Sequence, residues 1–279
     1  MTAGRARADA SLDRAPRLEG TALRVALQRV SGEFGLYIVG FVSLFVIWHL
    51  VAVYVVKSVL FTPPLPVFMR AIALAESGAL QEQIGASLQR IVSGFAIGSA
   101  IGVVIGLLMG SFRVVRRLLD PYIETLRFIP AVAMITVAVI WLGIGEASKV
   151  FIITYSTVFI VIITTAAGVS SIATNKIRAA QSLGAARHQI FFFVTLPATI
   201  PFILTGMRVA MANAFTTIVA AELVAANQGI GTMLWNARLY MLVEDIYVAL
   251  LALAILGFTI DRCFRWLTFR LAGRYSPMT

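Results

Sequence analysis

Two ionisable residues lie inside long apolar stretches of the chain. Arg208 and Glu222 both belong to the apolar segment 198–226 and are 14 residues apart. That separation is about 21 Å along a straight helix, so the two side chains cannot pair within one helix. Charged groups inside a membrane span usually face a cavity or a partner. We expect Glu222 to make a structural hydrogen bond to another span, and Arg208 to extend its side chain to the cytoplasmic end of its span. The alternative for both is a gate or pathway residue.

The other reactive residues do not form a catalytic or metal-binding set. The chain has one cysteine, Cys263, and two histidines, His49 and His188, too few for a multi-cysteine or histidine-rich metal site. The sequence contains no His-Glu-x-x-His, no Gly-x-Ser-x-Gly and no Gly-x-x-x-x-Gly-Lys-Ser/Thr motif. We expect no metal, no bound cofactor and no enzymatic activity. A membrane-embedded enzyme would need such a set, and a secondary transporter would show more buried carboxylates than Glu222 alone.

Residues 176–197 form a basic, amphipathic segment between two apolar stretches. Its apolar residues recur at helical spacing, at Ile177, Ala180, Leu183 and Gly184. Gly184 suits the left-handed end of a first short helix, and Pro197 suits the start of the next span. We predict two short helices that meet at a bend, present an apolar face to a groove on a partner, and move with the span that follows.

The composition indicates a membrane protein. Of the 279 residues, 59% are hydrophobic and 13% are charged, about half the charged fraction of a soluble domain. A helix needs about 20 apolar residues to cross a bilayer. Six segments satisfy this criterion and predict an all-α polytopic fold: 35–56, 89–112, 128–145, 149–170, 198–226 and 245–267.

Lysine and arginine predict the orientation of these spans. With the N-terminus inside, seventeen basic residues fall on the cytoplasmic side and five on the other, as the positive-inside rule requires. The net charge of +10 then reflects topology and not a nucleic-acid partner. We divide the chain into a cytoplasmic tail at 1–34, a membrane domain at 35–270 with a docking loop at 171–197, and a cytoplasmic tail at 271–279. Residues 57–88 connect two spans or form a platform for an external partner.

Glycine recurs every four residues through the second predicted span, at Gly94, Gly98, Gly102, Gly106 and Gly110. Small residues at this spacing let helices approach closely in lipid. We predict that the stripe is a helix-packing surface.

The docking loop resembles a signature of bacterial ABC importer permeases, which is Glu-Ala-Ala, three residues, Gly, nine residues and Ile-x-Leu-Pro. Ala179-Ala180, Gly184, Val194 and Leu196-Pro197 occupy the matching places, while Arg178 stands where the family often has Glu. Residues 139–149, 179–185, 204–208 and 219–231 extend the likeness. They are similar to permeases of the taurine, aliphatic sulfonate and nitrate branch.

The resemblance implies a type I ABC importer permease fold with six spans, located in the bacterial inner membrane. It implies a homodimer, two ATPase subunits that carry ATP and Mg, and an extracytoplasmic solute-binding protein. The implied solute is taurine or another organosulfonate, with nitrate, bicarbonate or an aromatic acid as alternatives, moved by alternating access. The residues expected to dock the ATPase are Arg178, Ala179, Ala180, Ser182, Leu183, Gly184, Ala185, Arg187, Leu196 and Pro197.

Overall fold

The computed structural model describes residues 35–36, 39–56, 58 and 60–272, and within them it contains helices, turns and bends but no strand. The predicted tail at 1–34 and residues 273–279 lie outside the described residues. The chain divides into two compact units, with the boundary between Pro66 and Val67. The all-α prediction is confirmed.

The N-terminal unit contains one span, Val39–Val56, whose last six residues form the π-helix η1 (Val51–Val56). It agrees with the predicted segment 35–56 over the residues described. The indole Nε1 of Trp48 donates a hydrogen bond of 3.1 Å to the carbonyl of Thr62. This bond fixes the turn that leads from the span towards the prolines at 63, 64 and 66.

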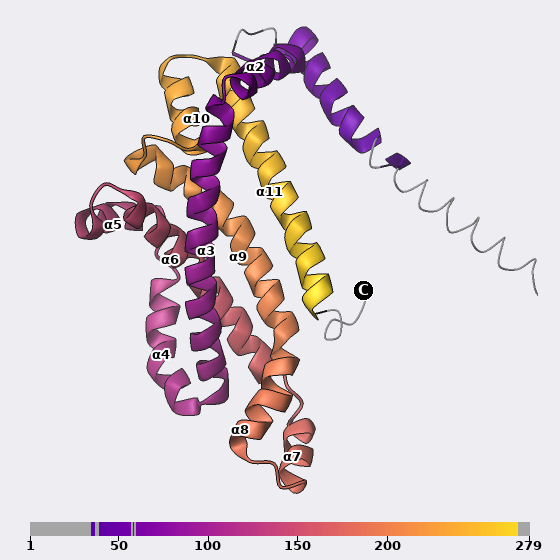
Figure 1. The fold of residues 1–279 in the computed structure, drawn as a ribbon, viewed down its shortest axis with the longest axis vertical. Coiled ribbons are helices and arrows are strands. Elements are labelled where there is room, and N and C mark those ends of the chain that lie inside the picture. Colours follow the sequence, from indigo (N-terminus) through magenta and orange to yellow (C-terminus); the bar gives the residue numbers. More distant parts are fainter. Residues whose placement is uncertain (1–34, 37–38, 57, 59, 273–279) are drawn as a thin grey trace, which may run out of the picture. The chain divides into compact units, whose positions relative to one another are not determined.

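Four long helices run along the second unit, with short helices at both ends (Figure 1). Near one end lie α2 and α10, and at the other lie α7 and α8. The elements are α2 (Pro64–Glu76), α3 (Ala79–Ser111), α4 (Arg113–Leu126), α5 (Met134–Leu142), α6 (Glu146–Ser170), α7 (Thr174–Ser182), α8 (Arg187–Ile190), η2 (Phe191–Thr195), α9 (Leu196–Ala225), α10 (Ile230–Leu239) and α11 (Val243–Ala272). Arg70 of α2 bonds Asp245 of α11, which raises the pKa of Arg70.

The glycine stripe packs against α6, as the small-residue spacing predicts. A Cβ added at any of its five positions would lie 2.4–2.8 Å from a side-chain carbon of Ile153, Thr157, Val161, Thr165 or Val169. Each glycine meets the residue 59 positions further along, so α3 and α6 run parallel in constant register. A core in which α9 joins them is built from Ile91, Phe95, Ile153, Val161, Ala210, Met211, Ala214 and Ile218.

Because α3 and α6 are parallel, the chain between them must return along their length. It does so in two short helices, α4 of 14 residues and α5 of nine, about 21 Å and 14 Å long and each shorter than a ~30 Å hydrocarbon core. The prediction of one continuous span at 128–145 is therefore wrong. In the part of the chain that the structure describes, five helices are long and apolar enough to span a membrane, and neither α4 nor α5 is among them.

Arg127 caps the C-terminal end of α4. The hydroxyl of Tyr155 donates a bond of 2.6 Å to the carbonyl of Leu126, so the end of α4 lies beside the middle of α6. Arg127 is one of the basic residues counted as cytoplasmic. If this position puts it within the span, the count becomes sixteen against five, and the predicted orientation is unchanged.

Candidate functional site

Glu222 lies at the centre of a buried hydrogen-bond cluster near the end of the unit that carries α10. Its side chain has 0% exposure. Arg90 Nη1 donates to Oε1 at 2.7 Å, Ser87 Oγ donates to the same oxygen at 2.8 Å, and the backbone N–H of Gly231 donates to Oε2 at 2.8 Å. This is the structural hydrogen bond to another span that the sequence predicts for Glu222.

Two further charges complete the cluster. Arg90 Nη2 donates to Glu146 at 2.8 Å, and Lys149 Nζ donates to the same carboxylate at 2.9 Å. The side chains of Arg90 and Lys149 are only 5% and 4% exposed. Two cations and two carboxylates balance, which is the condition under which buried charge is tolerated.

The cluster holds the junction of α9 and α10 against α3. Gly229 N–H donates to Gln83 Oε1 at 2.6 Å, and Ile230 N–H donates to Ser87 Oγ at 2.8 Å. Gly229 has a φ of +130°, and a Cβ there would lie 2.3 Å from the Glu222 carboxyl carbon. A side chain at this position would displace the carboxylate. We infer that α3, α6, α9 and α10 move as one body at this end.

Arg208 and Glu222 are not brought together. Arg208 Nε donates to Asp261 Oδ1 of α11 at 2.7 Å, and the Arg208 side chain is half exposed. The two residues that the sequence groups as gate candidates thus have separate partners on separate helices.

The docking loop forms the predicted pair of short helices. Gly184 has a φ of +79°, its N–H donates to the carbonyl of Gln181 at 2.9 Å, and Ala185 N–H donates to Ala180 at 3.1 Å. These two bonds make a Schellman motif, which ends α7. Gln189 Oε1 accepts from the N–H of Ala186 at 2.8 Å at the start of α8.

The α7 surface lies open in the isolated chain. None of its residues is buried, and Leu183 beside it is 88% exposed. The predicted apolar face is divided, however. Ile177 lines a cavity of about 630 Å³ together with Phe112, Ile172 and Ile190, so it packs inward while Leu183 points away. On the other side of the bend, α8 continues through η2 into α9, where Pro197 lies in the first turn as predicted.

A cleft of about 570 Å³ lies between residues 127–132, α6 and α9. Most of its wall is apolar, and we call it the polar cleft after the polar side chains of Asn213, Thr216 and Thr217 on α9. Asn213 Nδ2 donates to the carbonyl of Ser156 at 3.4 Å. The hydroxyls of Thr216 and Thr217 both donate to the Asn213 carbonyl, at 2.8 Å and 2.9 Å. Sequence reasoning missed these residues, because neutral polar groups scattered in an apolar span give a weak signal.

The depth of the cleft makes its polarity informative. Ser156 is ten residues from the start of α6, about 15 Å along the helix and half of a ~30 Å hydrocarbon core. Polar groups at this depth are unfavourable against lipid and usually face protein or water. Thr216 is exposed in the single chain. The arrangement favours a cleft that faces an aqueous path or another protein surface.

The model of the family described as "Binding-protein-dependent transport system inner membrane component" matches residues 98–276. A probable ABC transporter permease protein of Brucella melitensis is 38% identical over 77% of this chain and 87% of its own length. The taurine transport system permease protein TauC of Escherichia coli is 36% identical over 82% and 86%. The putative aliphatic sulfonates transport permease protein SsuC of E. coli is 37% identical over 73% and 77%.

Proposed function

The chain belongs to the binding-protein-dependent transport system inner membrane components, in the taurine, sulfonate and nitrate branch of ABC importer permeases, and on that premise we propose that it forms the membrane path of an ATP-driven importer. The family consists of transport components and not of catalytic enzymes. We assign ATP and magnesium to a separate ATPase subunit, present in two copies, and no cofactor to this chain.

We propose that the solute is a small anion or zwitterion, namely taurine or another organosulfonate. Support comes from the relatives whose names specify taurine and aliphatic sulfonates. Nitrate and bicarbonate are the alternatives that other relatives' names supply, and an aromatic acid remains a further one. A secondary transporter is a weaker candidate, because ion coupling would draw on more than the fully paired Glu222.

The observation that carries this proposal is the open docking loop. It supplies an unburied α7, the exposed Leu183 and the turn at Gly184, joined through α8 and η2 to α9. We propose that the ATPase groove receives this surface, so that ATPase motion is transmitted to α9. The loop then lies in the cytoplasm. Since α11 runs from the α10 end towards the α7 end (Figure 1), the C-terminus is cytoplasmic, and we place the N-terminus there too.

We propose that the polar cleft forms part of the solute path. A second copy of the chain closes it, and the solute-binding protein delivers solute at the end that carries α2 and α10. ATP binding draws the two docking loops together and opens the dimer outward, and hydrolysis resets it inward. The buried cluster around Glu222 supports this scheme because it keeps the helices of each subunit together while the subunits rock.

Co-purification tests the assignment of the loop. The full chain would be expressed with the ATPase and binding protein encoded beside it, and isolated through a tag on the permease. We expect the ATPase to be retained in the membrane fraction and after detergent extraction. If the permease folds and no ATPase accompanies it, the importer function is wrong.

A further inference from the structure

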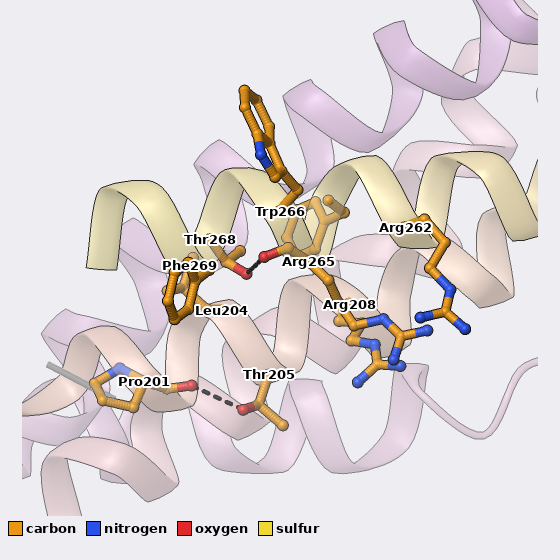
Figure 2. A pocket seen from close by; sticks show the side chains of 10 residues that line it. Pro201, Leu204, Thr205, Arg208, Arg262, Arg265, Trp266, Thr268 and Phe269 are labelled. Atoms are coloured by element: carbon orange, nitrogen blue, oxygen red, sulfur yellow. Dashed lines mark hydrogen bonds between the residues drawn. The ribbon is translucent and has the colours of Figure 1, made fainter. Parts of the chain in front are cut away.

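The pocket between α9 and α11 is the most strongly charged feature that the proposed transport cycle does not use. It has a volume of about 730 Å³. Three arginines line it, and Figure 2 shows their guanidinium groups gathered at one end, with Pro201 and Phe269 towards the other: Arg208, Arg262 and Arg265. The remaining wall is largely apolar and includes Leu204 and Phe264.

The arginines outnumber the carboxylates that pair with them. Arg208 and Arg265 share Asp261, each at 2.7 Å. Arg262 instead stacks over the ring of Phe258 at 5.0 Å. The site therefore carries two surplus positive charges.

The hydroxyls of the pocket are already committed. Thr205 donates to the carbonyl of Pro201 at 2.8 Å, and Thr268 donates to that of Arg265 at 2.9 Å (Figure 2). The guanidinium groups are thus the donors left for a ligand. A planar guanidinium offers paired N–H groups that match phosphate oxygens.

The pocket lies at the depth of a membrane surface. Asp261 is 18 residues from the start of α11, about 27 Å along the helix, against a ~30 Å hydrocarbon core. Trp266 and Phe269 follow on the same helix and are 57% and 70% exposed. Exposed aromatic side chains of this kind are typical of the boundary between lipid and water.

We propose that this pocket binds the phosphate headgroup of an anionic phospholipid. Basic pockets between membrane helices on the cytoplasmic side recognise such headgroups. The lipid would supply the missing counter-charge and join α9 to α11 near the end of α9 that leads into the docking loop. The cytoplasmic position of the site rests on the orientation given under the proposed function, but the site would exist whichever solute is transported.

Lipid binding to the purified full chain tests the proposal. Native mass spectrometry in a neutral detergent would compare phosphatidylglycerol with phosphatidylcholine of the same acyl chains. The pocket variant is Arg262→Gln/Arg265→Gln, and the matched control is Arg113→Gln/Arg117→Gln on α4, which removes the same charge from exposed positions. We expect phosphatidylglycerol affinity to fall about tenfold or more in the pocket variant and to stay within about threefold in the control.

Several results would overturn the proposal. An equal loss in both variants would mean diffuse surface charge. Equal binding of the two lipids, or displacement of phosphatidylglycerol by millimolar inorganic phosphate, would mean no lipid site or a site for free anions. If the double variant unfolds, Arg262→Gln alone keeps both bonds to Asp261 and should still lower phosphatidylglycerol affinity. Unchanged affinity in that folded variant contradicts the proposal.

Discussion

At the residue scale, Gly184 performs a task that few other residues can. Its φ of +79° ends α7, yet no atom lies within 4 Å of the place where a Cβ would stand. A side chain there meets open space in the isolated chain. Its steric effect would be felt by whatever docks on the loop.

Two substitutions at position 184 should therefore have different effects on ATPase binding. Asn tolerates the left-handed conformation and is small, so Gly184→Asn should retain ATPase binding. Gly184→Trp should lower co-purification of the ATPase by about tenfold, roughly 1.4 kcal/mol of binding. Thermal unfolding of the purified chain would check that both variants fold. Normal transport by Gly184→Trp would show that the loop does not dock the ATPase as proposed.

Substitution of Glu222 should lower the stability of the folded chain. Glu222→Gln leaves Arg90 with Glu146 as its remaining carboxylate partner. Removing one member of a buried pair costs about 3–5 kcal/mol, and we expect a loss at the lower end of this range because Glu146 remains. Unfolding of the purified chain in detergent would measure this. Glu124→Gln is the control, because the Glu124 side chain is 58% exposed and its pair with Arg127 lies outside the cluster, so water can compensate for the lost charge.

A double variant makes that prediction sharper. Arg90→Gln/Glu222→Gln removes both charges, so its loss of stability should be smaller than the sum of the two single losses. Additive losses would mean that the two residues are not energetically coupled.

The cluster also marks how far single residues could be predicted. The sequence places Glu222 deep in an apolar span and so predicts a hydrogen-bond partner. It does not reveal which one, because Arg90 and Ser87 are more than 130 positions away and Arg90 begins an apolar stretch like an ordinary flanking charge. Pairing of this kind is decided by tertiary packing.

At the element scale, α3 and α6 are held together by close packing. Some of the buried polar groups between them have no hydrogen-bond partner. The hydroxyls of Ser99, Thr157 and Thr165 are buried and have no hydrogen-bond partner among the described residues. An unpaired buried hydroxyl costs free energy without contributing a bond.

Two valine substitutions at one contact should therefore act in opposite directions. Thr157→Val exchanges the unpaired hydroxyl for a methyl group of similar size and should leave stability unchanged or raise it by about 1 kcal/mol. Gly98→Val places a branched side chain where a Cβ would already lie 2.8 Å from Thr157, and should lower it by about 1–3 kcal/mol. Equal stability of the two variants would contradict parallel packing along the glycine stripe.

The broken third crossing shows where element prediction failed. A span search rewards continuous apolar runs, and residues 128–145 form one. The structure instead uses α4, a basic amphipathic helix with Pro121 inside it, and the short α5 after a turn containing Pro130. The start of α3 at Ala79, ten residues before the predicted span, was hidden because its first turns carry Gln81, Glu82 and Gln83. Glu82 and Gln83 form hydrogen bonds with the loop before α10. In the sequence alone, such a polar segment is typical of a connector at the membrane surface.

At the scale of the whole molecule, the polar cleft connects the fold to transport. Asn213 and Thr216 lie near the middle of α9, while the docking loop precedes the N-terminal end of α9. Replacing these two residues by apolar ones should impair solute passage and leave ATPase docking intact. The loop and the cleft can thus be tested separately.

Asn213→Leu/Thr216→Val should lower solute uptake about tenfold, since it removes the Asn213 amide from the wall of the path and one lost hydrogen bond to a charged solute costs roughly 1.5 kcal/mol. ATPase co-purification should be unchanged. Thr259→Val is the control, because it removes an exposed hydroxyl of α11 that bonds its own helix. Normal uptake by the folded double variant would exclude the cleft from the path.

The sequence predicted the all-helical fold and the two short helices of the docking loop well because both depend on local sequence. Apolar composition predicts the membrane spans, and the position of Gly184 predicts the left-handed turn that ends α7. The cleft, the arginine pocket and the charge cluster depend on residues from several helices, and no local pattern announces them. Solute identity depends least on this chain's sequence if a separate binding protein selects it.

The most direct test of the central claim is solute-stimulated ATP hydrolysis in liposomes. The permease would be reconstituted with its neighbouring ATPase and binding protein and given taurine, alkanesulfonates, nitrate or an aromatic acid. We predict that taurine or another sulfonate raises the rate of hydrolysis. Stimulation only by another of these solutes would keep the importer and overturn the sulfonate proposal. The absence of any associated, solute-responsive ATPase would contradict the importer function itself.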